Sequence, residues 1–246
     1  NPPAYDPNYH HQLAIDAGLS AYAAPLGLLQ TSSDSFHGQI PTILKINSSN
    51  TLATSLDQAV TGSIDDALKL GCAAIGFTIY PGSDHNFSLM EEYRELSHEA
   101  KAKGLAVVLW AYARGTNISK KGETAMNIIS YAAHMSALLG ANIIKVKLPS
   151  DFLEEDPTKA AFENNKIAIG SLQERVAHIK KVAFEGKRLV VFSGGDAKDD
   201  NALMEEIKAI HLGGGNGSII GRNCFQRTRE DSLTLLDQMI QIYKSK

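Results

Sequence analysis

Two lysines, Lys145 and Lys147, lie two residues apart inside the apolar stretch ANIIKVKLPS (141–150). Successive side chains of a β-strand point to opposite faces, so in a strand both amines share one face. The other face then carries the apolar side chains of this stretch, Ile144, Val146 and Leu148. This spacing predicts two amines on the inner face of a buried strand.

A third lysine, Lys45, repeats the pattern in TILKIN (42–47), where Leu44 and Ile46 form the apolar face. An ammonium that is buried without a partner loses its proton more readily, and nearby cations act in the same direction. A neutral amine is the nucleophile that forms a Schiff base with a carbonyl. A lysine at a strand end that reaches solvent or pairs with an acid is the ordinary alternative, and it explains one lysine better than three.

The preceding predicted strand ends in LWAYARG (109–115), where Trp110 and Tyr112 are also two residues apart. The shared face would let Tyr112 relay a proton and Trp110 form a wall of the pocket, although the spacing by itself favours a pair of core aromatics. Arg114 follows in the loop, where it could meet an anionic substrate.

Two turns rich in small residues follow the last two predicted strands. FSGGD (192–196) contains Ser193, Gly194 and Gly195, and IIGRN (219–223) contains Gly221 and Arg222. Glycines let backbone N–H groups approach a phosphate, Ser193 adds a hydroxyl donor and Arg222 a charged fork. The pair of turns predicts a phosphorylated substrate.

These residues need a scaffold of alternating strands and helices. Short apolar runs predict strands at 20–25, 42–47, 73–78, 105–110, 142–147, 188–192 and 217–221. Helical patterns occupy 9–18, 86–104 (with Ser88 as the expected N-cap), 122–140 and 229–246. Repeated βα units in 246 residues predict a single (β/α)8 TIM barrel domain over 1–246, in which strand 1 is expected before Asn1. A doubly wound open sheet is the alternative, without a glycine fingerprint to support it.

The composition excludes several classes of protein. A net charge of −3 gives no basic surface for nucleic acid, and no apolar run reaches the length of a membrane span. Cys72 and Cys224 form neither a disulfide framework nor a metal motif, so we expect a cytoplasmic protein without metal. The acidic stretch 150–166 is expected to be a solvated insertion, with a lid or subunit contact as the functional alternative.

Taken together, these motifs resemble the archaeal-type class I fructose-bisphosphate aldolases, within the superfamily of Schiff-base aldolases with TIM barrels. The resemblance covers about residues 40–227 and rests on motifs in the family's order and spacing: PTILKIN, GFTIYPGS, VVLWAYARG, GANIIKVK, VVFSGGD and IIGRNCFQR. It implies metal-independent cleavage of fructose 1,6-bisphosphate to dihydroxyacetone phosphate and glyceraldehyde 3-phosphate, and the reverse. It also implies no cofactor and a homo-oligomer.

The resemblance assigns roles to individual positions. Lys145 matches the lysine of the Schiff base, Tyr112 the proton-transfer tyrosine and Trp110 its neighbouring tryptophan. Other matched positions hold the phosphates: Arg114, Ser193, Gly194, Gly195, Gly221 and Arg222. Lys147 is expected to tune Lys145 or contact substrate, with Lys45 in support. The family's strand-1 aspartate has no counterpart in residues 1–20, which places it before Asn1.

The sequence is also compatible with two other functions. One is another Schiff-base aldolase or transaldolase of the superfamily that acts on a different phosphorylated sugar. The other is an inactive barrel that binds a phosphosugar.

Overall fold

The computed structural model describes residues 2–193 and 199–245. The main sheet of this part of the chain has seven parallel strands, in the order β1-β2-β5-β6-β7-β8-β9. Their bounds are β1 Tyr22–Pro25, β2 Thr42–Lys45, β5 Ala74–Ile79, β6 Ala106–Ala111, β7 Ile143–Lys147, β8 Leu189–Ser193 and β9 Ser218–Ile219. A short antiparallel hairpin of β3 (Asn47–Ser48) and β4 (Ala59–Val60) follows β2. Each of the seven predicted strands is confirmed.

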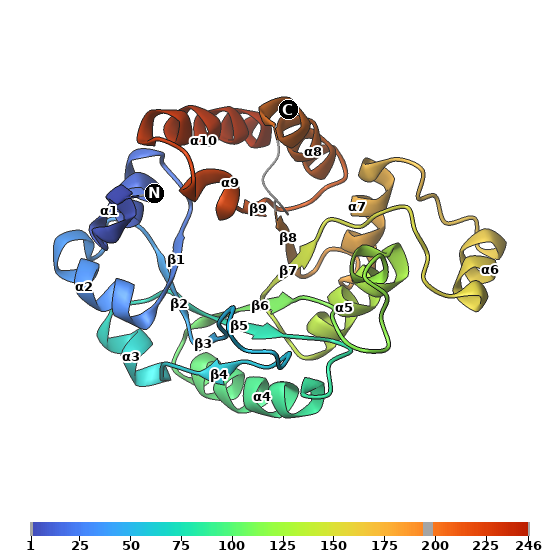
Figure 1. Cartoon of the computed structure of the whole chain (residues 1–246), viewed down its shortest axis with the longest axis horizontal. Coiled ribbons are helices and arrows are strands. Elements are labelled where there is room, and N and C mark those ends of the chain that lie inside the picture. The colour runs from blue at the N-terminus through green and yellow to red at the C-terminus, as the bar shows by residue number, and fades with distance from the viewer. Residues whose placement is uncertain (1, 194–198, 246) are drawn as a thin grey trace.

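The sheet curls as a barrel does, and helices lie around its outside (Figure 1). The strands follow one another in chain order, without the reversal of a doubly wound sheet, so the architecture is that of a TIM barrel. Within the described residues, β1 and β9 are the two edges of this sheet. The expectation of a further strand ahead of Asn1 stays a prediction.

Helices connect most of the successive strands. They are α1 (Asn8–Asp16), α2 (Leu26–Phe36), α3 (Ile64–Lys69), α4 (Asn86–Ala102), α5 (Met126–Leu138), α6 (Asp156–Asn164), α7 (Leu172–Val182), α8 (Asp200–Leu212), α9 (Arg222–Phe225) and α10 (Arg229–Lys244), with 3-10 turns η1 (Pro2–Tyr5) and η2 (Gly122–Thr124). The four predicted helices are present as α1, α4, α5 and α10. The acidic insertion forms α6, which projects from the barrel (Figure 1).

The predicted N-cap of α4 is wrong. The helix begins at Asn86, its N-cap is His85, and the Ser88 hydroxyl donates to the carbonyl of His85 at 2.9 Å. Ser88 is therefore inside the first turn, because the backbone already bends at the residues before Asn86.

Two apolar layers result from the alternation along the strands. Leu44, Ile144 and Val146 belong to the large core between sheet and helices. The opposite faces form a smaller cluster inside the curl, made of Ile43, Ala74, Val108 and Trp110. The predicted division of each lysine strand into an outer apolar face and an inner face is confirmed.

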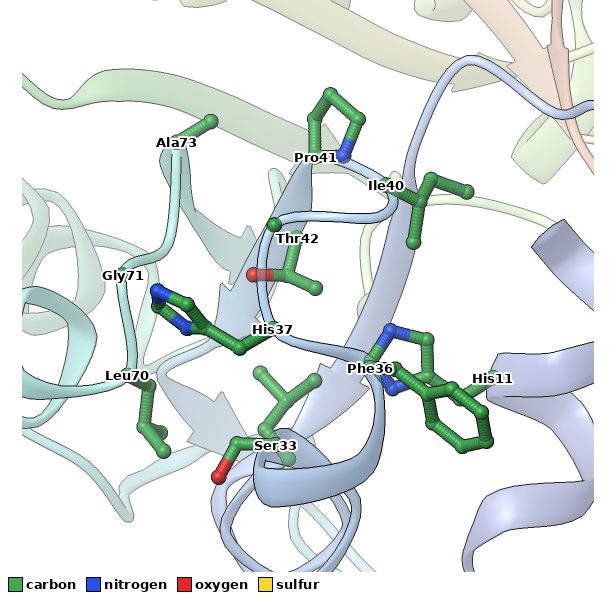
Figure 2. A pocket seen from close by; sticks show the side chains of 12 residues that line it. His11, Ser33, Phe36, His37, Ile40, Pro41, Thr42, Leu70, Gly71 and Ala73 are labelled. Carbon is green, nitrogen blue, oxygen red and sulfur yellow. The ribbon is translucent and has the colours of Figure 1, made fainter.

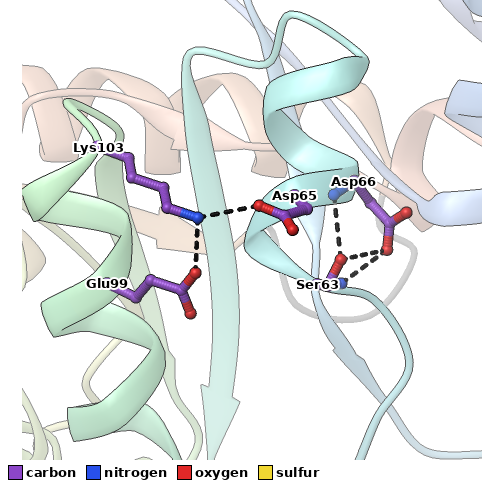
Figure 3. Close-up of polar contacts among 5 residues, drawn as sticks. All are labelled: Ser63, Asp65, Asp66, Glu99 and Lys103. Atoms are coloured by element: carbon purple, nitrogen blue, oxygen red, sulfur yellow. Dashed lines mark hydrogen bonds and ion pairs between the residues drawn. The ribbon is translucent and has the colours of Figure 1, made fainter.

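The short helix α3 is stabilised from both sides (Figure 3). Ser63 and Asp66 form a capping box, in which the Asp66 N–H donates to Ser63 Oγ at 3.1 Å and Ser63 N–H donates to Asp66 Oδ2 at 2.9 Å. Lys103 bridges Asp65 and Glu99, with N–O distances of 2.9 and 2.8 Å. This exposed network links α3 to α4, although solvent-exposed ion pairs contribute little to stability.

Candidate functional site

Lys145 lies on β7 directly beside Trp110 of β6 in the strand register. Its side chain is buried, and its Nζ lies 5.7 Å from the centre of the Trp110 ring and 5.8 Å from that of Tyr112. Burial lowers the pKa of Lys145 to about 7. A substantial fraction of this amine is therefore neutral at pH 7 and able to attack a carbonyl.

Lys45 approaches the same indole from β2, with Nζ 5.8 Å from the Trp110 ring centre. Its Nζ donates to the backbone carbonyl and, at 2.7 Å, to the side-chain Oδ1 of Asn47. Burial, and then the charge of Lys145, lower the pKa of Lys45 to about 7. The predicted convergence of Lys45 and Lys145 inside the barrel is confirmed.

Asn47 and the hairpin around it were not identified from the sequence. The Asn47 amide donates to the Thr78 carbonyl at 2.9 Å and accepts from the Thr78 N–H at 2.8 Å. Gln58, at the far side of the hairpin, donates to the Tyr80 hydroxyl at 2.5 Å. The only hint in the sequence is the position of Asn47, which is two residues beyond Lys45.

Gly76 of β5 was also missed, and it provides the space for Trp110. A Cβ added at Gly76 would lie 2.0 Å from Trp110 Cζ3, so the ring occupies the place of a side chain. A lone glycine within an apolar strand often marks such a close approach. That signal was available in AAIGFT (73–78).

Tyr112 directly follows β6, lies near Lys145 and lines the larger of the two cavities described below. Burial raises the pKa of its phenol, although a hydrogen bond to Ser193 acts in the opposite direction. Arg114 stacks over the Tyr80 ring at 5.2 Å, and its buried Nε has no hydrogen-bond partner among the described residues. The structure places Tyr112 within the field of the Arg114 charge and in hydrogen-bond contact with Ser193.

A cavity of about 510 Å³ opens beside these groups. Its wall has two basic side chains, Lys45 and Arg114, and two phenols, Tyr80 and Tyr112. The remaining lining residues are mostly hydroxyl and amide residues of the hairpin, with Thr78 of β5: Asn47, Ser48, Ser49, Asn50, Thr51, Ala53, Ser55, Leu56, Gln58 and Thr78. Such a wall suits a polar molecule that carries hydroxyl groups and negative charge.

Lys147 is paired with a carboxylate, although the expectation was that its charge lowers the pKa of Lys145 or that it contacts the substrate. Its Nζ forms an ion pair with Glu123 Oε2 at 2.7 Å, and the Lys147 cation is not among the causes of the lowered pKa of Lys145. Glu123 lies in η2, 24 residues earlier in the chain. The physical reason is local: a carboxylate at this distance compensates most of the field of the ammonium.

The predicted phosphate-binding residues are only partly visible. Gly194 and Gly195 lie outside the described residues. Ser193 ends β8 next to Lys147 and Ile219, while Gly221 and Arg222 begin α9. The structure brings Ser193 and Tyr112 together, and the charge of Arg222 also acts on Tyr112.

A second cavity, of about 260 Å³, lies at the other end of the strands (Figure 2). Thr42 and Ala73, at the beginnings of β2 and β5, line it together with His11 and His37. The lysines lie toward the strand C-termini, where TIM-barrel active sites are found, so the larger cavity is the candidate active site. In the part of the chain that the structure describes, no three His, Cys, Asp or Glu side chains could hold a metal ion.

Comparison with known proteins agrees with this geometry. A family profile described as DeoC/LacD family aldolase matches residues 4–227. The chain is 31% identical to the fructose-bisphosphate aldolase class 1 of Thermoproteus tenax, over 92% of this chain and 76% of that protein. It is 30% identical to the probable fructose-bisphosphate aldolase class 1 of Chlamydia muridarum, over 99% and 73%.

A solved structure supports the same relationship. It is an archaeal fructose-1,6-bisphosphate aldolase whose catalytic Lys is covalently bound to the carbinolamine intermediate of the substrate. It superposes with a TM-score of 0.83 at 28% identity and covers 100% of this chain and 86% of that chain. No described helix has both the length and the apolar character needed to span a membrane. The chain belongs to the DeoC/LacD family of aldolases, as a class I enzyme of the Schiff-base type.

Proposed function

We propose that this protein cleaves fructose 1,6-bisphosphate reversibly to dihydroxyacetone phosphate and glyceraldehyde 3-phosphate, with Lys145 as the nucleophile. The observation that carries the proposal is the buried Lys145 amine, with a pKa of about 7, between Trp110 and Tyr112. The aldolase names of the relatives support this choice of substrate.

The reaction begins when the neutral Lys145 Nζ attacks the ketone carbon and forms a carbinolamine. Loss of water gives a protonated imine, which withdraws electrons from the adjacent carbon. The carbon beyond that one carries a hydroxyl group. When this hydroxyl loses its proton, the bond between these two carbons breaks, and glyceraldehyde 3-phosphate leaves. The bonding electrons form an enamine, which is then protonated and hydrolysed to dihydroxyacetone phosphate.

Tyr112 is the proposed proton-transfer group, and Trp110 the wall against which the intermediate packs. Because burial raises its pKa, the Tyr112 phenol stays protonated at neutral pH and can donate a proton. The hydrogen bond with Ser193 orients the phenol. Lys45, which approaches the same indole from β2, supports the site with a second amine of low pKa.

The charged ends of the substrate need cations and N–H donors. Arg114 suits one phosphate, because its buried Nε lacks a partner among the described residues and the residue lines the cavity. Ser193, Gly194, Gly195, Gly221 and Arg222 are proposed for the other phosphate. Bidentate guanidinium–phosphate pairs are among the stronger charge-assisted hydrogen bonds.

The test is a coupled assay that measures both triose phosphates released from fructose 1,6-bisphosphate, with and without EDTA. The proposal predicts activity that is insensitive to EDTA and falls by at least about a thousandfold in Lys145→Met. Fructose 1-phosphate serves as the comparison substrate. Activity in Lys145→Met equal to that of the parent would exclude the proposed role, and activity on other phosphorylated sugars alone would favour the superfamily alternative.

A further inference from the structure

Glu123 divides its carboxylate between two lysines. Its Oε2 accepts from Lys147 Nζ at 2.7 Å, and its Oε1 lies 3.0 Å from Lys120 Nζ. The Glu123 and Lys147 side chains are only 16% and 21% exposed, whereas Lys120 is 91% exposed. The Lys147 pair is therefore the sheltered one, and hydrogen bonds to both lysines lower the pKa of Glu123 against the effect of its burial.

The two lysines of β7 therefore share a face of the strand but have different partners. Lys145 has no acidic partner among the described residues, and its Nζ lies near the rings of Trp110 and Tyr112. Lys147 lies two residues further along the strand, beside Ser193, and is held by a carboxylate. An ammonium in an ion pair has no free electron pair with which to attack a carbonyl.

The position of Glu123 does not depend on Lys147. Glu154 accepts hydrogen bonds from Ser119 N–H and Oγ, both at 2.8 Å, and Gly122 N–H donates to Ser119 Oγ at 2.9 Å. Across the same loops, Ser150 N–H donates to the Thr124 carbonyl at 2.7 Å. The loops after β6 and β7 therefore fix η2 and present Glu123 to Lys147.

We propose that Glu123 is a positioning residue that selects the nucleophile, because its ion pair engages the side chain of Lys147 and leaves Lys145 as the amine that reacts. The inference rests on the proposed Schiff-base function and adds a determinant to it. Without the carboxylate, the Lys147 amine can form its own imine: its nitrogen bonds to the ketone carbon, and the carbonyl oxygen leaves as water.

The first test is independent of any substrate. Parent, Glu123→Gln and Glu154→Gln proteins are labelled briefly with acetic anhydride at pH 7, and acetylation of Lys147 is quantified by peptide mass spectrometry. We expect severalfold more labelling of Lys147 in Glu123→Gln, because the carboxylate no longer holds its amine in an ion pair. Glu154→Gln, which loosens the same loop without touching Lys147, should leave it unchanged. Equal labelling in all three proteins, or the same rise in both variants, would overturn the inference.

The second test asks whether the released amine reacts. Lys145→Met and the double variant Lys145→Met/Glu123→Gln are incubated with fructose 1,6-bisphosphate and borohydride. An adduct on Lys147 in the double variant alone supports the selection. If the parent traps substrate on Lys145 but the double variant traps none, the inference fails and the proposed function stands. If the parent traps nothing, the proposed function fails and nucleophile selection fails with it, whereas control of Lys147 by Glu123 is still decided by the acetylation result.

Discussion

At the scale of single residues, Lys145 is reactive because its burial disfavours the charge. Its folded pKa of about 7 lies below the ordinary value of 10.5. Between these two pH values the unfolded chain binds the proton more strongly than the folded chain does. The free energy of unfolding therefore rises with pH across this window, and the cost of Lys145 is greatest at and below pH 7.

Replacing Lys145 with Met removes that cost together with the nucleophile. We expect Lys145→Met to be more stable than the parent by roughly 2–4 kcal/mol at pH 7, with a smaller gain at pH 9. Urea unfolding of both proteins at the two pH values measures the difference. A gain that is equal at both pH values would contradict the assignment of a depressed pKa to Lys145.

The contact between Gly76 and Trp110 gives a second prediction at this scale. In Gly76→Ala the new methyl group overlaps the indole, so the ring must leave the position that it occupies near Lys145 and Lys45. Overpacking of this kind costs about 1–3 kcal/mol, and we expect a loss of aldolase activity that exceeds the loss of stability. The matched control is Gly27→Ala, where an added Cβ meets nothing within 4 Å. Equal behaviour of the two variants would show that the Trp110 position is unimportant.

At the scale of elements, the hairpin of β3 and β4 joins β2 to β5 above the lysines. Asn47 carries this connection, because its amide pairs with both the N–H and the carbonyl of Thr78 and also accepts from Lys45. At the other end of the hairpin, the Gln58 side-chain amide donates to the Tyr80 hydroxyl. The hairpin is therefore part of the site and not a peripheral loop.

Asn47→Ala should break this connection. The variant leaves two buried backbone groups of Thr78 without partners, at a cost of about 1–3 kcal/mol each. It also removes the side-chain acceptor of Lys45, which keeps the Asn47 backbone carbonyl as a partner. Thermal unfolding and kcat/KM should both fall. Asn50→Ala, which removes only exposed hydrogen bonds within the hairpin, is the control. A similar decrease in both variants would mean that the hairpin acts only through its general stability.

Sequence patterns predict the elements of this fold better than they predict the contacts between them. Period-two alternation places Lys45 and Lys145 on the inner face, because the apolar residues next to them in each strand pack on the opposite face, against the helices. The same alternation is silent about Glu123, which meets Lys147 through a loop fold set by Glu154 and Ser119. The Asn47–Thr78 pair likewise joins residues 31 positions apart. Only the three-dimensional path of the chain determines such partners.

At the scale of the whole molecule, the curl of the sheet brings together strands that are far apart in the sequence. Lys45 of β2 and Lys145 of β7 both approach the indole of Trp110 on β6, and Lys45 also lines the larger cavity. The second cavity at the opposite end shares no lining residue with it. One end of the barrel therefore holds the proposed chemistry.

The homo-oligomer expected from the resemblance is a prediction at the same scale. Tyr131 and Leu138 of α5 are each 66% exposed, so this helix offers apolar side chains for contact with another copy. We expect sedimentation velocity to give a species larger than one chain, and a Tyr131→Lys/Leu138→Lys variant to sediment more slowly. A monomer in the parent protein would contradict the expectation.

The central claim, that Lys145 forms the covalent intermediate, is tested most directly by borohydride reduction in the presence of fructose 1,6-bisphosphate, followed by peptide mass mapping. We expect one stable adduct, on Lys145, that forms faster as the pH rises to about 7 and levels off above it, because the neutral amine is then in excess. An adduct on Lys45 in place of Lys145, or no adduct with an active enzyme, would contradict it.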